Sequence, residues 1–216
     1  MYDLNMGYSR NFALNTAFLF FLFLPGQAIH SQKYDERIEK LSLEIESQVI
    51  DWRHWFHETA ELSKREFKTS KRIATILRDM GYKPQINVAK TGVVAVLNGR
   101  KRGPVVALRA DIDGLPIKER VDIPWASKMT GVYNGETVPV MHACGHDLHI
   151  CIGLGVARLL AENQSLLLTR VRLLFQPAEE IATGAVSYTH LRAHETREDR
   201  GWRGVMVKKK GGGGGG

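Results

Sequence analysis

Apolar residues recur every three or four positions along several stretches of the chain, and this spacing predicts helices. One helix spans residues 34–58, and another spans residues 69–80. A third covers residues 148–162, where Gly153 and Gly155 allow a neighbouring element to approach closely. The apolar stripe of the first helix consists of Ile38, Leu41, Ile45, Val49, Trp52 and Phe56.

Short runs rich in β-branched and apolar residues predict strands at 92–97, 104–108 and 170–175. The turn-forming pair Asn98-Gly99 follows the first of these runs. We therefore expect the first two strands to be adjacent and largely buried. Helices and strands together predict an α/β fold with a mixed sheet flanked by helices.

The N-terminal segment 1–28 is typical of a secretory signal peptide. Its apolar run, residues 12–24, is too short to cross a bilayer about 30 Å thick as a helix. Gly26 and Ala28 supply the small residues of a cleavage site. The alternative is an N-terminal anchor, and both interpretations place the protein outside the cytoplasm, secreted or periplasmic. Removal of the signal would leave no stable membrane span.

The C-terminal segment 186–216 has neither helical nor strand periodicity and ends in six glycines. It resembles translated sequencing-adapter read-through, and the alternative is a basic, glycine-rich flexible tail. Both interpretations make it a disordered segment outside the fold, so we assign the folded body to residues 29–185. His190 and His194 have the spacing of a metal-binding pair, but we interpret them as accidental because they lie in this segment.

The formal net charge of +7 raises the question of a nucleic-acid partner. Segment 186–216 holds seven Lys and Arg against three Asp and Glu, so the body carries only +3. We therefore expect no nucleic-acid partner. The two cysteines, Cys144 and Cys151, do not make a disulfide scaffold, although one disulfide between them is an alternative. Cys151 is better interpreted as a core residue of the third helix.

Three polar clusters follow apolar strands or strand-like segments. They lie at residues 109–116, 141–149 and 176–180. In open α/β sheets, ligands and catalytic groups gather beyond the carboxyl ends of the strands. We therefore expect the three clusters to converge on one site.

The second and third clusters combine a thiol, imidazoles and carboxylates, which together suit zinc or a similar divalent ion. Cys144 and His146 can face a common centre from a turn. Glu179 and Glu180 are expected to point in different directions, so that one binds metal while the other accepts a proton. Taken singly, these carboxylates would more often lie in the first turn of a helix. We expect His54 and His57 to pack or form hydrogen bonds and not to bind metal.

The sequence resembles the metal-dependent amidohydrolases of the aminoacylase and carboxypeptidase superfamily, the M20-type peptidases. The similarity extends over residues 52–185 and is closest to the branch with hippurate hydrolase, N-acyl-amino-acid deacylases and auxin-conjugate hydrolases. Five blocks carry it in the family's order: HETAELSKREFKTS (57–70), ALRADIDGLPIKE (107–119), PWASK (124–128), VMHACGHDLH (140–149) and LLFQPAEEIATGA (173–185).

The resemblance implies metal ligands at Cys144, His146 and Glu180, and a general base at Glu179. It also implies residues that support the ligands, with Asp113 the most plausible hydrogen-bonding partner. These supporting residues are Asp111, Asp113, His142, Asp147 and His149. The complete centre would hold two divalent ions, zinc or manganese, with a bridging water that Glu179 deprotonates for attack on an amide carbonyl.

The implied substrate is an N-acyl amino acid or a small peptide-like amide. Family members are about twice as long as this chain, and they carry a lid and dimerisation domain and further histidine ligands beyond the paired glutamates. The fold expected here is therefore a truncated metallopeptidase-like catalytic domain without that lid, and a homodimer is implied only for the full-length form. The alternative function is a catalytically incomplete fragment with at most weak metal binding.

Overall fold

The computed structural model describes residues 25–101 and 103–183, with side chains from residue 36 onward. The chain divides into two units, Met1–Glu46 and Ser47–Gly216, and each is described by itself. The proposed tail, the pair His190 and His194, and residues 1–24 of the signal segment lie outside the described residues. Among the described helices, none is both long and apolar enough to cross a membrane.

Helix α2 (Pro25–Glu58) begins nine residues before the predicted start, so the last residues of the proposed signal segment are helical. Within the second unit, Trp52 and Phe56 are buried in the core, as their place on the apolar stripe predicts. Within the first unit, Ile38 is 52% exposed. The stripe is thus buried in its C-terminal part, and within the first unit the described residues belong to a single helix.

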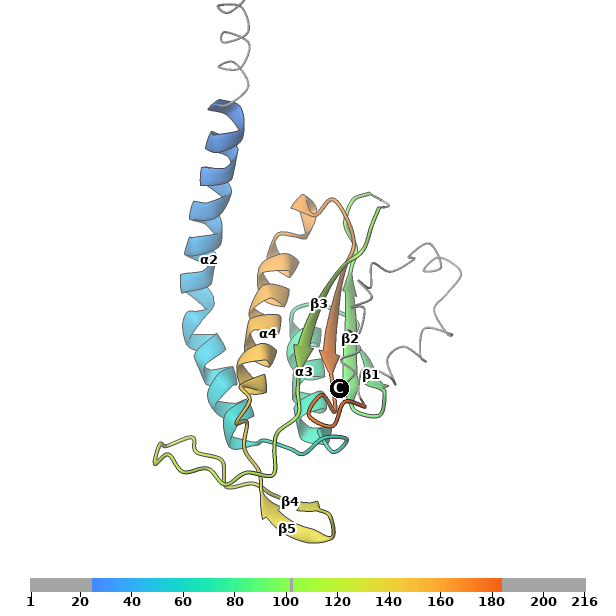
Figure 1. The fold of residues 1–216 in the computed structure, drawn as a ribbon. Coiled ribbons are helices and arrows are strands. Elements are labelled where there is room, and N and C mark those ends of the chain that lie inside the picture. Colours follow the sequence, from blue (N-terminus) through green and yellow to red (C-terminus); the bar gives the residue numbers. More distant parts are fainter. Residues whose placement is uncertain (1–24, 102, 184–216) are drawn as a thin grey trace, which may run out of the picture. The chain divides into compact units, whose positions relative to one another are not determined.

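The second unit is built on a four-stranded mixed sheet with the order β1-β2-β6-β3 (Figure 1). Strands β6 and β3 are parallel, whereas β1 pairs with β2, and β2 with β6, in antiparallel fashion. The strands are β1 (Gln85–Val88), β2 (Gly92–Leu97), β3 (Val106–Asp111) and β6 (Val171–Gln176). This confirms the predicted α/β class and mixed sheet.

The prediction that the first two long strands are adjacent is wrong, because β6 lies between β2 and β3. Backbone amides of Arg100 and Lys101 donate to the carbonyls of Leu167 and Leu168, both at 2.9 Å. The connection after β2 therefore runs along the segment that leads into β6, and does not turn back as a hairpin. Strand β3 begins exposed, with Val106 55% exposed, because it is the outer strand of the described sheet.

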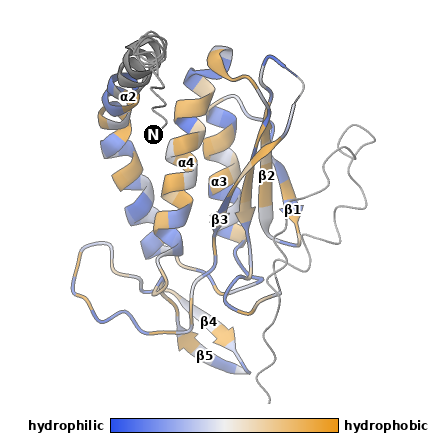
Figure 2. Cartoon of the chain, turned by 45° about the horizontal axis from the view of Figure 1, so that its top comes forward, coloured by the Kyte–Doolittle hydropathy of each residue, from blue (hydrophilic) through white to orange (hydrophobic). Residues whose placement is uncertain are grey.

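Helices α3 (Phe67–Asp79) and α4 (His146–Glu162) cover one face of the sheet (Figure 2). A short 3-10 helix, η1 (Gln164–Leu166), follows α4. Gly153 fulfils its predicted role, because a Cβ there would lie 3.1 Å from the ring of Phe175 and 3.3 Å from Ala110. Its lack of a side chain lets α4 lie directly on β6 and β3.

A second, two-stranded sheet lies beyond the carboxyl ends of β3 and β6 (Figure 1). Strands β4 (Thr130–Tyr133) and β5 (Glu136–Pro139) form a hairpin closed by Asn134 and Gly135, which have φ angles of 51° and 86°. Asn-Gly with positive φ at both positions is the preferred two-residue hairpin turn. The sequence carried this signal, but the prediction included only the strand-like end at residues 138–140.

Candidate metal centre

The carboxyl ends of the parallel strands β3 and β6 bring the first and third polar clusters together. Asp111 is paired with Gln176 in the sheet, and both strands end there. Pro177 follows immediately and cannot donate a ladder hydrogen bond, so the chain leaves the sheet at that point. The second cluster arrives differently, since it follows β5 of the small hairpin and leads into α4. The predicted convergence of all three clusters is therefore correct, although only two of them follow strands of the main sheet.

A sharp turn at the start of α4 places two potential ligands on the same side. Gly145, between Cys144 and His146, has φ 81°, a conformation that favours glycine. One donor atom from each of Cys144, His146 and Glu180 lies within 4.8 Å of the other two. We call these three residues the ligand cluster. His146 is buried, Glu180 is largely buried and Cys144 is exposed.

Asp113 is the residue that orients the ligand cluster. Its backbone carbonyl accepts a 2.9 Å hydrogen bond from Nδ1 of His146, which leaves Nε2 free to face the cluster. Its carboxylate accepts hydrogen bonds from the backbone amides of Glu179 and Glu180 at 3.2 and 3.1 Å. The hydroxyl of Ser63 donates to the same carboxylate at 2.6 Å. Asp113 thus holds in one arrangement the imidazole of His146 and the loop that carries Glu179 and Glu180, which we call the glutamate loop. Such a supporting contact is what the family resemblance implies for Asp113.

The environment of Asp113 and His146 favours their charged forms. Burial alone raises the pKa of Asp113, but hydrogen bonds from His146, Ser63 and two backbone amides bring it below its ordinary value. Burial alone lowers the pKa of His146, yet its contacts with Asp113 outweigh burial and raise the pKa to about 9. With no metal present, a proton on His146 offsets part of the surrounding negative charge.

Glu179 and Glu180 do not point in different directions, and that expectation is wrong. Their carboxylate oxygens lie 3.8 and 3.9 Å from Nε2 of His146. The reason is that these residues lie in a tight loop, with Ala178 and Ala182 at φ 54° and 53°, where successive side chains do not alternate as in a strand. The two differ in exposure instead, with side chains 39% and 15% exposed.

The donor set of the ligand cluster fits a divalent metal ion. Oxygen Oε1 of Glu180 is buried and has no hydrogen-bond partner among the described residues. Burial raises the pKa of the Cys144 thiol, and so does the negative charge of Glu180, Glu179 and Asp111. A buried carboxylate oxygen without a hydrogen-bond partner, beside a thiol and an imidazole, is stabilised by a bound cation.

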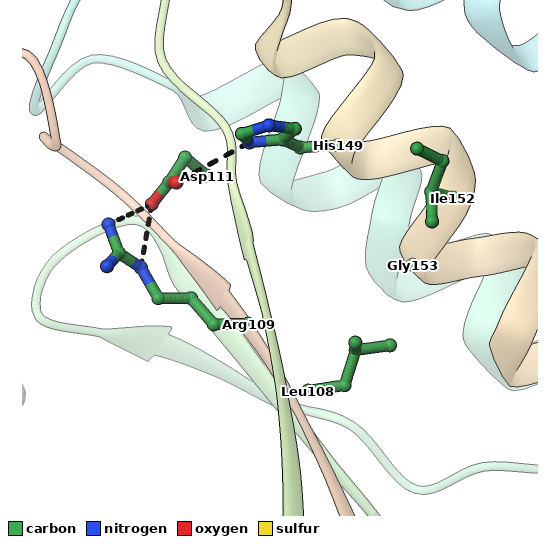
Figure 3. Close-up of a pocket in the computed structure, with 6 residues that line it drawn as sticks. All are labelled: Leu108, Arg109, Asp111, His149, Ile152 and Gly153. Atoms are coloured by element: carbon green, nitrogen blue, oxygen red, sulfur yellow. Dashed lines mark hydrogen bonds and ion pairs between the residues drawn. The ribbon is translucent and has the colours of Figure 1, made fainter.

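Asp111 lies at the edge of this site, beside a pocket of about 260 Å³ (Figure 3). Its Oδ1 accepts hydrogen bonds from Nε and Nη2 of Arg109 at 3.0 and 2.6 Å, and its Oδ2 lies 3.5 Å from Nδ1 of His149. The lining residues are Leu108, Arg109, Asp111, His149, Ile152 and Gly153. Asp111 and His149 also form a second candidate ligand group with His146, in which the donor atoms lie within 4.8 Å of one another.

Asp147 faces away from the ligand cluster and joins a separate buried group. Its Oδ2 lies 2.8 Å from Nδ1 of His57 and 3.0 Å from Nε of Arg53. The other ring nitrogen of His57 lies 2.8 Å from the carboxylate of Glu119. We call Arg53, His57, Glu119 and Asp147 the Asp147 network. Asp147 therefore pairs with His57 and Arg53 and not with a residue of the ligand cluster, although it directly follows His146 in the sequence.

His142 is buried, and neither of its ring nitrogens has a hydrogen-bond partner among the described residues. Burial lowers its pKa to about 4, so its ring is neutral.

Cys151 is a buried core residue, as predicted, and both cysteines are free, so the alternative of a disulfide between them is wrong. His57 forms hydrogen bonds and His54 stacks on Trp125 at 3.8 Å between ring centroids, which confirms that the two side chains form hydrogen bonds or pack.

The sequence reasoning missed three features of this site. These are the Asp147 network, the contact of Arg109 with Asp111, and the buried carboxylate of Glu66 behind the glutamate loop. Each of these contacts involves charged residues of types that are common on protein surfaces, so residue type alone does not reveal it. The one indication for Glu66 was its place within the block HETAELSKREFKTS, and its burial is seen only in the structure.

The chain is similar to known proteins in both sequence and fold. The model of peptidase family M20/M25/M40 matches residues 107–211. An N-acetyl-L-cysteine deacetylase of Bacillus subtilis is 48% identical over 141 residues, which cover 65% of this chain and 32% of that protein. An IAA-amino acid hydrolase ILR1-like 5 of Arabidopsis thaliana is 44% identical over 149 residues, covering 67% and 32%.

Among solved structures, the chain is similar to the Bacillus subtilis YXEP protein, described as a dinuclear metal binding peptidase from the M20 family. The identity is 41% and the TM-score is 0.62, over 68% of this chain and 39% of that one. The chain thus spans about a third of the length of the curated relatives it matches. On this family match, these identities and this fold, the chain belongs to peptidase family M20/M25/M40.

Proposed function

We propose that this chain is part of a metal-dependent amidohydrolase that cleaves the amide bond of N-acyl amino acids or related small amides. The observation that carries the proposal is the ligand cluster with the free carboxylate of Glu179 beside it. Relatives named as a deacetylase of N-acetyl-L-cysteine and a hydrolase of IAA-amino acids support the substrate class.

We assign Cys144, His146 and Glu180 as the residues that hold the metal. Zinc or manganese is the proposed ion, since a thiolate and an imidazole favour zinc and a carboxylate accepts either. A complete site would hold two ions, in keeping with the dinuclear description of the structural relative. When bound, the metal supplies Lewis-acid polarisation of the amide carbonyl and lowers the pKa of water.

Glu179 performs the proton transfers. Its carboxylate lies beside the ligand cluster and is 39% exposed, so a water and a substrate can reach it. It accepts a proton from the attacking water as the new C–O bond forms. It then donates that proton to the amide nitrogen as the C–N bond breaks, giving a carboxylic acid and a free amine.

Asp113 and Arg109 keep these groups in place. Asp113 fixes the ring of His146 and the backbone of both glutamates. Arg109 pairs with Asp111, and its Nη2 lies 4.0 Å from the carboxylate of Glu179.

A second candidate function is a catalytically incomplete fragment that binds metal weakly. The observation in its favour is that the chain spans 32% of the length of each of the two curated relatives described above. In addition, only three ligand groups, enough for one ion, gather in the ligand cluster of the described residues.

One experiment separates the two candidates. Zinc binding and hydrolysis of a panel of N-acetyl and N-benzoyl amino acids are measured on the 216-residue chain and on Glu179→Gln. Glu136→Gln, at an exposed position in β5, is the matched control. Zinc binding with hydrolysis that Glu179→Gln abolishes supports the enzyme. Zinc binding without hydrolysis supports the incomplete fragment, and a chain that binds no zinc contradicts both.

We also propose that the protein is secreted or periplasmic and that its full-length form is a homodimer. The support for the location is the apolar run in residues 12–24 with small residues after it. Fractionation of cells that express the intact gene tests the location, and a cytoplasmic product with its N-terminus retained would contradict it.

A further inference from the structure

Glu66 is a charged residue that is completely buried, with 0% of its surface exposed. Both of its carboxylate oxygens are used. Oε2 accepts a 2.6 Å hydrogen bond from the hydroxyl of Thr91, and Oε1 accepts a 2.8 Å hydrogen bond from the backbone amide of Ala178. A buried carboxylate has a large desolvation cost, which such hydrogen bonds must offset.

Ala178 lies immediately before Glu179 and Glu180 and has an unusual backbone conformation. Its φ of 54° lies in the left-handed region, which a residue with a Cβ adopts at a cost. It is also buried, so its amide cannot be satisfied by bulk water. The hydrogen bond to Glu66 therefore does two things, because it satisfies this amide and holds the strained residue in place.

Three consecutive backbone amides thus donate to two buried carboxylates. Ala178 donates to Glu66, whereas Glu179 and Glu180 donate to Asp113. Glu66 directly precedes α3, and Asp113 lies shortly after the end of β3. The loop is consequently held from two separate parts of the fold, and neither attachment alone fixes both of its ends.

We propose that Glu66 is a positioning residue for the metal centre, which acts through the amide of Ala178 to set where Glu179 and Glu180 lie relative to His146. The inference rests on the proposed function, since it assigns the purpose of this contact to the metal site. The length of the side chain matters more than its charge, because what the loop needs is an acceptor at the position of Oε1. Burial raises the pKa of Glu66, so a neutral side chain of equal length is a suitable replacement.

Three variants of the full chain test this proposal. Glu66→Gln keeps the length and an acceptor oxygen and removes the charge. Glu66→Asp keeps the charge and withdraws the carboxylate by one methylene. Thr91→Val is the matched control, because it removes the other hydrogen bond of Glu66 and leaves Ala178 its acceptor.

Two quantities are measured on each variant. The first is the affinity for Co²⁺, with the absorption of the thiolate of Cys144 bound to Co²⁺ as the spectroscopic signal. The second is the hydrogen exchange rate of the Ala178 amide in the metal-free chain, followed by NMR. The exchange rate requires neither bound metal nor activity, so it tests the positioning contact independently of the proposed function.

We expect Glu66→Asp to lower the Co²⁺ affinity by about 10–100-fold, as loss of a residue that orients a ligand typically does. The Ala178 amide should exchange faster in the same variant. Glu66→Gln and Thr91→Val should stay within about threefold of the unmodified chain in both measurements, well below the effect expected of an orienting residue.

The proposal is overturned if Glu66→Asp leaves the Ala178 exchange rate unchanged, or if Thr91→Val weakens Co²⁺ binding as much as Glu66→Asp does. Loss of affinity in Glu66→Gln equal to that in Glu66→Asp would overturn the proposal as well, because an acceptor of the right length would then not be sufficient. An unmodified chain that binds no Co²⁺ counts against the proposed function, and the exchange rates then decide the positioning contact alone.

Discussion

His146 and Asp147 are neighbours at the start of α4, but they belong to two polar groups of opposite character. The Asp147 network pairs two carboxylates with Arg53 and His57 through contacts of 2.8 to 3.0 Å. The ligand cluster and Glu179 leave carboxylate oxygens 3.8 and 3.9 Å from the single imidazole that faces them. The same residue types therefore form a closed network of short contacts around Asp147 and an open group of longer contacts around His146.

Unpaired atoms, and not residue types, distinguish a candidate metal site here. In the Asp147 network each carboxylate has a partner within 3.0 Å, so a bound cation would add little. In the ligand cluster, Oε1 of Glu180 is buried without a partner among the described residues, and His146 directs a free nitrogen toward it. The four predictions that follow test this contrast.

The largest effect is expected from removal of a buried imidazole on the open side. His146→Ala should lower zinc affinity by more than about 100-fold, since loss of a ligand exceeds the 10–100-fold typical of its supporting residues. His57→Ala, an equally buried histidine in the closed network, should change zinc affinity by less than about tenfold. Competition with a chromogenic chelator measures both, and equal effects would remove the distinction between the two groups.

The next largest effect is on stability. Here the loss is expected from a change in the Asp147 network and not from a change beside the ligand cluster. Asp147→Ala should lower the free energy of unfolding by about 3 kcal/mol, because it leaves the buried ring of His57 and the guanidinium of Arg53 without their partner. Glu179→Ala should change it by less than about 0.5 kcal/mol, as is usual for an exposed side chain without such a role. Urea unfolding of the metal-free chain measures both values. A large loss in Glu179→Ala would mean that the open group is also a structural one.

The third prediction concerns pH. The pKa of His146 is raised from 6.5 to about 9, so below pH 9 a proton must leave its ring before metal binds. Zinc affinity should therefore rise by about tenfold per pH unit for each proton released as pH increases toward 9. The thiol of Cys144, whose pKa is also raised, adds a second proton.

The stability of the metal-free chain should change with pH in the opposite sense. Because the folded-state pKa of His146 is raised, the stabilisation from its contact with Asp113 is complete below pH 6.5 and is lost as pH rises through about 9. Calorimetry of zinc binding in buffers of different ionisation enthalpy counts the released protons. Affinity that does not vary between pH 6 and 8 would contradict the assignment of His146.

The smallest effect separates the two thiols. Cys144 is exposed, whereas Cys151 is buried and burial raises its pKa to about 12. Iodoacetamide at pH 8 should modify Cys144 and leave Cys151 intact, because reaction requires an accessible thiolate. Saturating zinc should slow the modification of Cys144 by about tenfold or more, since bound metal occupies the sulfur. Peptide mapping by mass spectrometry measures both, and modification of Cys144 at equal rates with and without zinc would argue against its ligand role.

Local structure was largely predictable from the sequence because it depends on local spacing. The predicted limits of α3, α4, β2 and β6 agree with the structure to within two residues. The order of the strands was not predictable in this way. It depends on the path of the chain between β2 and β3, which hydrogen bonds to Leu167 and Leu168 determine from far along the sequence.

In the candidate site, too, local features could be predicted and contacts between distant parts of the chain could not. The turn at Gly145 and the support from Asp113 were accessible from motifs of a few residues. The contact of Glu66 with Ala178 joins positions 112 residues apart, and that of His57 with Asp147 joins positions 90 residues apart. Nothing in the sequence connects Glu66 or His57 with its distant partner, so these two contacts could be identified only from the fold.

Gly153 connects the packing of the sheet to the chemistry of the metal centre. It lies seven residues, or about 10 Å, along α4 from His146, where the helix rests on Phe175 and Ala110. A tilt of about 5° around this point would displace the start of the helix by about 1 Å. Misplacement on that scale can lower a reaction rate by about 100-fold. The close packing of α4 at Gly153 therefore helps to determine where His146, the histidine of the ligand cluster, lies relative to the sheet.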